Sequence, residues 1–219
     1  MDGRIVELLR ISFFQILLPG LKVTVPLTLV SFTLGLMIAL LTALVQVAGV
    51  KVLRRIARCY VWIFRGTPML VQLYVVFYGL PKLGFILNAI PAAVLVFSLN
   101  TGAYASETIR AAIESVPLGQ FEAGFCVNMT YTQTMFRIIL PQAFRTAFPP
   151  LSNSLIGLVK DTSLASNITV TEMFLVSQRI AARTYEPFWL YCEVGVIYLI
   201  FCTFLTWLQR VIERKLRRE

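Results

Sequence analysis

The 219-residue sequence contains no histidine, the side chain that most often binds metals and acts as a general base near neutral pH. This absence excludes zinc hydrolases and mechanisms that activate a serine or cysteine through an imidazole. The four cysteines lie far apart and form no C-x-x-C pair, which indicates neither a zinc site nor a disulfide framework. We therefore expect no catalytic site, no metal and no resident cofactor in this chain.

The sequence also lacks the phosphate-binding loop of nucleotide hydrolases, because no glycine is followed by Lys-Ser or Lys-Thr. We therefore do not expect this chain to hydrolyse ATP itself. Any ATPase, with its ATP and Mg, would be a separate partner subunit.

Charged residues are scarce, at 14% against about 25% in soluble domains, while 58% of the residues are hydrophobic against roughly 45–50%. A transmembrane helix takes about 20 residues, so the length allows about half a dozen helices and little else. The net charge of +9 does not indicate nucleic acid, because the basic residues stand beside apolar runs rather than along one amphipathic face. The composition predicts an all-α integral membrane protein with one domain, residues 1–219.

Five stretches are predicted to cross the membrane, preceded by an interfacial helix over residues 1–18, whose apolar residues have helical spacing. Pro68 interrupts the second stretch, the third carries Asn100 and Glu107, and the fourth contains Arg145. Aromatic residues lie toward the ends of the last stretch, as membrane interfaces favour. The predicted spans are residues 21–48, 57–80, 84–112, 138–160 and 187–210.

An odd number of spans places the two termini on opposite sides of the membrane. Segments 51–58, 110–145 and 210–218 carry four, three and five Lys or Arg residues, twelve in all, against six on the other side. Cytoplasmic loops are enriched in Lys and Arg. We therefore expect the N-terminus outside and the C-terminus in the cytoplasm.

The loop 115–137 is then cytoplasmic, and its pattern predicts a helix-turn-helix. Pro117 ends the third span, a short helix follows, and Asn128 tolerates the left-handed conformation that closes helices. Thr130 and Gln133 fit a capping box that opens a second helix.

This loop is expected to contact another protein. Phe121 and Phe125 form an apolar ridge beside Glu122, which suits insertion into a groove. Segment 118–135 contains no Lys or Arg to meet phosphates, so DNA binding is not indicated. The alternative is a loop that packs on its own spans.

Several motifs in this order resemble those of a known family. Glu122-Ala123-Gly124, then Asn128, then Ile138-x-Leu140-Pro141 is similar to the EAA loop of ATP-binding-cassette importer permeases. FRGTP (64–68), YGLP (78–81), SLNTGAYASE (98–107), ILPQA (139–143), PPLSNS (149–154) and KDTSL (160–164) resemble the polar amino-acid permeases, and the cystine permeases in particular. The chain departs from the pattern at Gly124, where the family has a second alanine, and at Asn128, where it has glycine.

The resemblance implies a permease that dimerises with a second copy or a related chain in a bacterial plasma (inner) membrane. It further implies a cytoplasmic ATPase dimer, an extracytoplasmic solute-binding protein and a polar amino acid as partners. The coupling loop would dock on the ATPase through Gln120, Phe121, Glu122, Ala123, Gly124, Phe125 and Asn128.

A polar stripe on the third span is the first candidate substrate site. Asn100, Glu107 and Glu114 are seven residues apart and advance by only about 20° per step on a helix, with Tyr104 nearby. Ionisable groups at membrane depth usually face a cavity or a partner, so Glu107 is a candidate for the ammonium group of a substrate. The alternative is an internal pair with Arg110 or a salt bridge within the bundle.

Lys160 and Asp161 are the second candidate. Neighbours on a helix point about 100° apart, so each needs its own counter-charge, and a zwitterionic amino acid would supply both. Alternatively, Lys160 bonds Glu107 with nothing bound. The resemblance implies that the third-span stripe and KDTSL line the central cavity. The predicted substrate-binding residues are Asn100, Tyr104, Glu107, Lys160, Asp161 and Thr162.

The RGTP segment is a candidate gate or hinge formed by Arg65, Gly66, Thr67 and Pro68, because broken helices in transporters line cavities. The alternative role for Arg65 is to cap the carbonyl groups that the break leaves free. After KDTSL, segment 167–183 is predicted to form an amphipathic outer helix.

Two other functions are compatible with the composition. A secondary transporter driven by a proton or sodium gradient would use Glu107 and Asp161 as its relay, although the sequence shows no internal repeat of the kind such transporters often have. A membrane scaffold without transport activity is the other.

Overall fold

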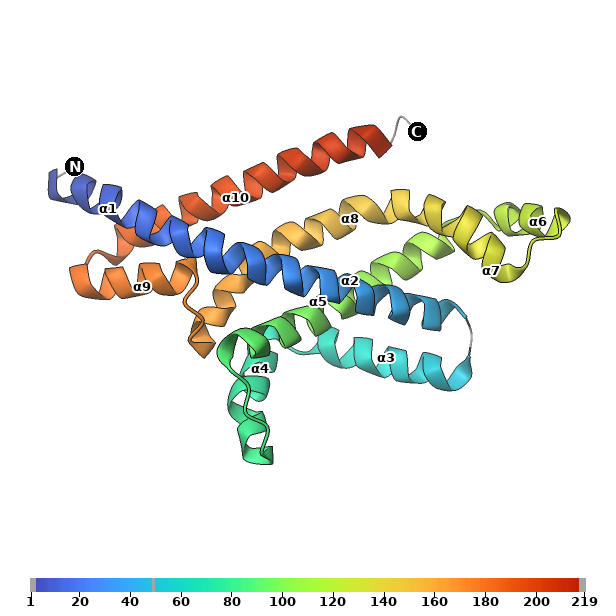
Figure 1. Cartoon of the computed structure of the whole chain (residues 1–219), viewed down its shortest axis with the longest axis horizontal. Helices are drawn as coiled ribbons and strands as arrows, with labels where there is room; N and C mark the ends of the chain where they lie inside the picture. The colour runs from blue at the N-terminus through green and yellow to red at the C-terminus, as the bar shows by residue number, and fades with distance from the viewer. Residues whose placement is uncertain (1–2, 49, 217–219) are drawn as a thin grey trace.

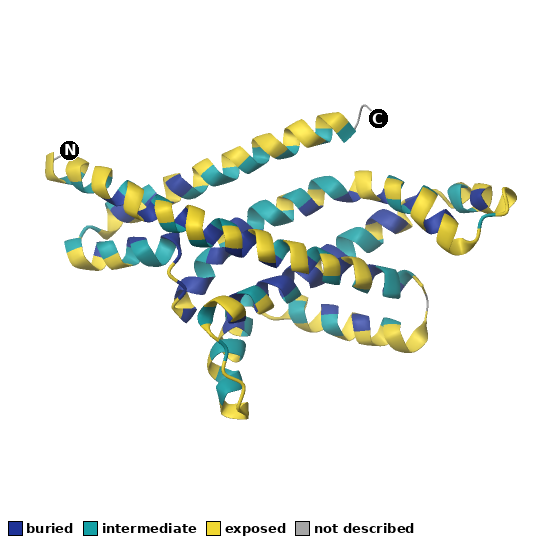
Figure 2. Cartoon of the chain, viewed as in Figure 1, coloured by how far each residue is buried: buried dark blue, intermediate teal, exposed yellow. Residues whose placement is uncertain are grey.

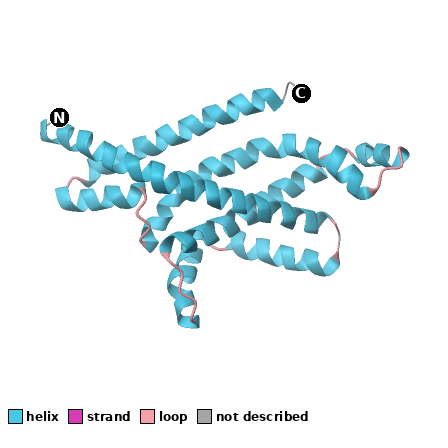
Figure 3. Ribbon diagram, in the orientation of Figure 1, coloured by secondary structure: helices cyan, strands magenta, loops and turns pink. Residues whose placement is uncertain are grey.

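The computed structural model describes residues 3–48 and 50–216, and every regular element within them is helical (Figure 3). The α-helices are α1 (Gly3–Pro19), α2 (Val25–Val47), α3 (Lys51–Gly66), α4 (Met69–Tyr74), α5 (Ala89–Glu114), α6 (Leu118–Cys126), α7 (Tyr131–Thr134), α8 (Leu140–Asp161), α9 (Met173–Thr184) and α10 (Pro187–Leu216). Short π or 3₁₀ turns occupy Gly20–Thr24, Val75–Gly79, Leu80–Leu83, Met135–Ile139 and Thr162–Ile168.

The first two helices form one run from Gly3 to Val47, joined by the π turn Gly20–Thr24. The expected interfacial helix over residues 1–18 is therefore not set off from the first span by a break. Pro26 lies at the start of α2, where the missing backbone N–H of proline is tolerated. The wider π turn before it keeps the helix continuous.

Three helical runs are long and apolar enough to cross a membrane: Gly3–Val47, Ala89–Glu114 and Pro187–Leu216. A fourth candidate is the pair Lys51–Gly66 and Met69–Leu83, which bends by 104° at its break. Helix α8 matches the predicted fourth span in position but carries Arg145 and two internal prolines. Five crossings and their orientation thus stay predictions.

The break between α3 and α4 confirms the interruption predicted at Pro68. Thr67 has φ −122° and ψ 144°, because a following proline disfavours the helical conformation. Helix α4 points away from the long axis of the bundle (Figure 1).

The core of the bundle is formed around α5, which packs most extensively on α2 and also contacts α3 and α8. Small residues allow this close approach: a Cβ added at Gly35 of α2 would lie 2.9 Å from the Cβ of Thr101. Buried residues gather in the middle of the bundle, where these helices cross (Figure 2).

Helices α1, α9 and α10 form a second packing unit at one end of the molecule (Figure 1). Ser12 of α1 donates to the Oε2 atom of Glu193 in α10 at 2.5 Å, which gives that charged residue a partner inside the helix pair. The α2–α3 turn and helices α6 and α7 lie toward the opposite end (Figure 1).

Candidate functional site

A cavity of about 390 Å³ lies where the α3–α4 break faces α5 and α8. Its lining includes Asn100 and Tyr104 of α5, Asp161 at the end of α8, and Thr67 and Pro68 of the break. The structure therefore brings half of the predicted substrate residues together with two of the predicted hinge residues. We call this the first cavity.

Asn100 is held at the edge of the first cavity by hydrogen bonds to residues on both sides of the α3–α4 break. Its side chain is buried, and its Nδ2 donates to the Oε1 atom of Gln72 at 3.1 Å and to the carbonyl oxygen of Phe64 at 3.3 Å. Gln72 itself donates through Nε2 to the carbonyl oxygens of Phe64 at 2.9 Å and Thr67 at 3.0 Å. Gln72 thus ties together the two helices on either side of the break.

Sequence reasoning missed Gln72. One of the two alternatives gave this capping role to Arg65, whereas in the structure Gln72 bonds the carbonyl oxygens of Phe64 and Thr67 at the break. The signal was present, since Gln72 is an isolated polar residue in an apolar stretch shortly after Pro68. Arg65 instead turns toward α5, where its guanidinium carbon lies 5.2 Å from the ring centroid of Tyr104. A gate or hinge role for residues 65–68 stays a prediction.

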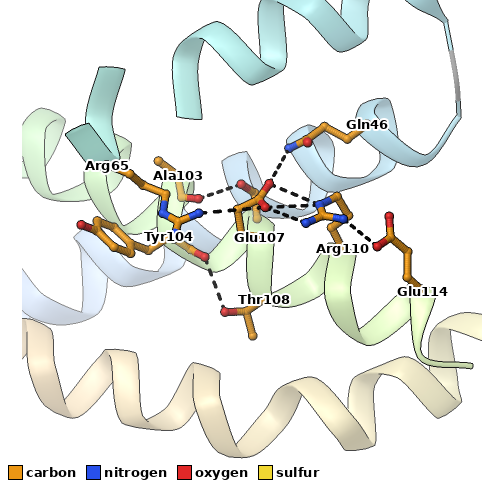
Figure 4. A network of polar contacts seen from close by, with 9 residues as sticks. Gln46, Arg65, Ala103, Tyr104, Glu107, Thr108, Arg110 and Glu114 are labelled. Atoms are coloured by element: carbon orange, nitrogen blue, oxygen red, sulfur yellow. Dashed lines mark hydrogen bonds and ion pairs between the residues drawn. The ribbon is translucent and has the colours of Figure 1, made fainter. Parts of the chain in front are cut away.

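Glu107 faces a separate cavity of about 290 Å³ between α2, α3 and α5, which we call the arginine cavity. Its Oε2 atom lies 2.8 Å from Nη2 of Arg110 and 4.0 Å from Nη1 of Arg65, and Gln46 donates to its Oε1 atom at 3.1 Å (Figure 4). Of the two alternatives for Glu107, the internal pair with Arg110 is therefore present. Its role toward a substrate stays a prediction.

Lys160 and Asp161 point into different cavities, as their angular separation on a helix requires. Asp161 lines the first cavity, whereas Lys160 lines a third one of about 330 Å³ beside α9 and α10. Thr162 is buried and donates to the carbonyl oxygen of Val159 at 2.6 Å. The alternative pair of Lys160 with Glu107 is not found among the ion pairs of residues 3–48 and 50–216.

The loop between α5 and α8 has the predicted helix-turn-helix form. The hydroxyl of Thr130 accepts from the N–H of Gln133 at 3.3 Å, and Oε1 of Gln133 accepts from the N–H of Thr130 at 2.9 Å. This confirms the capping box. Asn128 has φ 59°, which confirms its left-handed conformation.

The predicted apolar ridge of this loop is divided between two environments. Phe121 is partly buried, packs against the core formed by α2, α5 and α8, and stacks on Tyr131 with ring centroids 6.5 Å apart. Phe125 is 57% exposed, and Glu122 is exposed as well. The loop therefore packs on its own chain through Phe121 and presents Phe125 and Glu122 outward.

Gly124, one of the two departures from the family pattern, is buried against Thr134 of α7. A Cβ at this position would lie 2.6 Å from Oγ1 and 2.7 Å from Cγ2 of Thr134. Glycine here allows α6 and α7 to approach closely. The alanine of the pattern would require a smaller partner residue.

Glu172 caps α9 and lies outside the candidate membrane-spanning helices. It is fully buried and accepts hydrogen bonds from the N–H groups of Phe174 and Leu175 and from the hydroxyl of Tyr198, at 2.7 to 2.9 Å. Burial raises the pKa of this carboxyl above its ordinary value, and the three hydrogen bonds only partly offset the effect.

Comparison with known proteins agrees with this architecture. Residues 31–218 match the family model described as the binding-protein-dependent transport system inner membrane component. The chain is 51% identical to the L-cystine transport system permease protein TcyB of Bacillus subtilis (strain 168), over 97% of this chain and 91% of that protein. It is 35% identical to the arginine transport system permease protein ArtQ of the same organism, over 92% of each chain.

Solved structures share the fold. An amino acid ABC transporter crystallised with histidines has a chain of 31% identity that superposes with a TM-score of 0.87, over 94% of this chain and 96% of that one. A chain of the MetNI methionine ABC transporter in an inward-facing conformation reaches a TM-score of 0.73 at 18% identity, which supports the fold alone. The chain therefore belongs to the binding-protein-dependent transport system inner membrane component family and is a permease of the ATP-binding-cassette class.

Proposed function

We propose that the chain is the permease subunit of an amino-acid importer and that cystine is among its substrates. The observation that carries this proposal is the 51% identity with the L-cystine permease TcyB, which extends over 97% of the chain. The first cavity adds a chemical argument, because it offers a carboxylate and a phenol hydroxyl to a polar ligand.

The topology proposed for this function is a single membrane domain, residues 1–219, with five crossings, the N-terminus outside and the C-terminus in the cytoplasm. It supposes that α8 crosses the membrane beside α5. The arrangement in Figure 1 supports this orientation, since the α2–α3 turn, α6 and α7, and the C-terminal end of α10 all lie toward one end of the molecule. The basic segment 51–58 and the basic residues at the end of α10, Arg210, Arg214 and Lys215, are at this end.

At the first cavity, we assign the ammonium group of the amino acid to Asp161 and its carboxylate to the hydroxyl of Tyr104. Asn100 holds the cavity wall through Gln72, so its amide hydrogens are already used. The break at Thr67 and Pro68 forms part of the same wall, which places a bend of the backbone beside the ligand. Movement at this bend would change the access to the cavity.

Energy would reach the cavity through α6. Phe125 and Glu122 face outward from this helix toward a cytoplasmic ATPase dimer that binds ATP and Mg, while Phe121 joins the helix to the core around α5 and α8. A movement of the ATPase at the exposed side chains of α6 would pass through the packed side chain of Phe121 to the membrane helices. A second copy or a related permease chain and an extracytoplasmic solute-binding protein complete the proposed assembly in a bacterial plasma membrane.

Uptake measurements test this function. Cells that lack their own cystine uptake would express the chain with its ATPase and solute-binding protein, and would be offered radiolabelled cystine, arginine, glutamine and histidine in parallel. We expect cystine uptake that continues under a protonophore and stops when ATP is depleted. Uptake that stops under the protonophore while ATP is maintained would instead identify a gradient-driven transporter.

A further inference from the structure

The arginine cavity is lined by four guanidinium groups and one carboxylate, and it shares no lining residue with the first cavity. Helix α3 contributes three of the arginines, and α5 contributes the fourth together with the glutamate. Its lining residues are Gln46, Arg54, Arg58, Val61, Trp62, Arg65, Glu107 and Arg110.

The charges in this cavity are unequally paired. Arg110 bonds both Glu107 and Glu114, at 2.8 and 2.6 Å, and Arg65 shares Glu107 at 4.0 Å. Arg54 and Arg58 have no carboxylate oxygen within 4.0 Å anywhere in residues 3–48 and 50–216. Arg54 and Arg58 therefore line the cavity without a carboxylate of the described residues to balance their charge.

Arg54 carries a second, independent sign of a missing partner. Its Nε atom is buried and makes no hydrogen bond with any other described part of the chain. A buried donor is nearly always paired in folded proteins, and a guanidinium donor pairs best with a carboxylate or phosphate oxygen. Because Arg54 and Arg58 are four residues apart on α3, they also repel each other on one face of the helix.

The surroundings of this pair favour a ligand at the membrane surface. Trp62 lines the same cavity and is 75% exposed, and tryptophan is enriched at the level of the lipid headgroups. The pair lies in the basic segment at the start of α3. Basic pockets between membrane helices on the cytoplasmic side take up lipid phosphates.

We propose that the arginine cavity binds an oxyanion of the phosphate class, held between Arg54 and Arg58. Either the headgroup of an anionic lipid or a free phosphate supplies this chemistry. The bound anion neutralises the cavity wall opposite Glu107 and thereby stabilises the contact between α3 and α5. The site shares no lining residue with the first cavity, so its occupancy changes the stability of the permease without competing with an amino acid bound there.

The test uses the full chain purified in a neutral detergent. Thermal unfolding and native mass spectrometry would be recorded with phosphatidylglycerol, with phosphatidylcholine and with inorganic phosphate. The variant Arg54→Gln with Arg58→Gln removes the two charges of the site. The variant Lys51→Gln with Arg55→Gln removes two charges from the same helix at positions that do not line the cavity, and serves as its control.

We expect phosphatidylglycerol, but not phosphatidylcholine, to raise the unfolding temperature of the unaltered chain and to bind roughly thirtyfold more weakly to the cavity variant. The control variant should keep most of the affinity, and Arg54→Lys with Arg58→Lys should recover much of the loss. A free anion is the source if inorganic phosphate gives the same shift and loses it in the same variant. Equal responses to both lipids and to phosphate, or equal losses in cavity and control variants, would overturn the proposal.

Discussion

Asn100 donates through Nδ2 to the Oε1 atom of Gln72 at 3.1 Å, which joins the most buried helix of the bundle to the short helix beyond the break. Gln72 in turn donates to the carbonyl oxygen of Phe64 on the other side of Pro68. Two amide side chains thus satisfy the backbone groups that a bend of 104° would leave without partners. The hydrogen bonds of these two side chains therefore fix the bend that forms part of the wall of the first cavity.

Replacing Gln72 by alanine should destabilise the chain by about 1–3 kcal/mol, because the carbonyl oxygen of Phe64 and the amide of the buried Asn100 lose a hydrogen-bond partner. Thermal unfolding of the purified protein measures this loss. Gln15, which is exposed on α1, provides the control: Gln15→Ala should change the stability by no more than about 0.5 kcal/mol. Equal stabilities of the two variants would show that the break does not depend on Gln72.

The two phenylalanines of α6 should separate folding from coupling. Phe125→Ala removes an exposed side chain, so we expect normal stability and a permease whose partner ATPase no longer responds to substrate. Phe121→Ala removes a side chain that packs against the core, so we expect a lower unfolding temperature as well. ATPase activity of the assembled complex, measured with and without the amino acid, checks the first variant. Intact coupling in Phe125→Ala would contradict the docking role of α6.

The features that could be predicted from sequence are those that depend on neighbouring residues. The capping box of Thr130 and Gln133, the left-handed Asn128 and the break at Pro68 are all set within a few residues of the chain. The different directions of the Lys160 and Asp161 side chains follow from helical geometry as well. Which helices surround each side chain does not follow from it.

The features that could not be predicted depend on which helices become neighbours. The position of Arg65 over Tyr104 requires α3 to lie beside α5, and the bond of Gln46 to Glu107 requires α2 to lie on the same side. For the same reason the sequence alone does not decide whether Glu107 faces a ligand or an arginine. Arg110 is only three residues away on the same helix, whereas the cavity beside Glu107 is formed by residues of three different helices. A single sequence contains the residues of these contacts but not their pairing.

Neutralising Asp161 should stop transport without preventing folding. Asp161→Asn keeps the size of the side chain but removes the charge that we assign to the ammonium group of the amino acid in the first cavity. We expect uptake to fall at least tenfold, since a charged hydrogen bond contributes about 1.5–3 kcal/mol. The adjacent Lys160 lines another cavity, and Lys160→Gln should retain most of the uptake. Equal losses of uptake in both variants would contradict the assignment of the substrate to the first cavity alone.

The buried cap of α9 predicts a pH dependence of stability. The pKa of Glu172 is raised in the folded state by burial, so the folded chain holds a proton that the unfolded chain has already released. The stabilisation from this group is complete below the unfolded value, near pH 4.5, and is lost as the pH rises through the raised value.

Glu172→Gln removes the titration while keeping an oxygen that accepts from the N–H groups of α9. The unfolding temperature of the unaltered chain should therefore fall more steeply with rising pH than that of the variant. Scans between about pH 4 and pH 8 measure both slopes. Parallel curves would show that the pKa of Glu172 is the same in the folded and unfolded states.

Gly124→Ala should displace α6 from α7, because the new Cβ would lie 2.6 Å from Oγ1 and 2.7 Å from Cγ2 of Thr134. Overpacking of this kind costs about 1–3 kcal/mol, and it moves the exposed face of α6 relative to the core. Gly119 lies on the same helix, and Gly119→Ala is the matched control, because a Cβ at this position would meet nothing within 4 Å.

Combining Gly124→Ala with Thr134→Ala should recover both stability and coupling, because the second change removes the two atoms that the new methyl group would strike. Unfolding temperature and substrate-stimulated ATPase activity of the assembled complex follow the two effects separately. Recovery of stability without recovery of coupling would mean that Gly124 serves the ATPase contact directly. Recovery of both would show that the chain compensates for its departure from the alanine of the family pattern by the fit between α6 and α7.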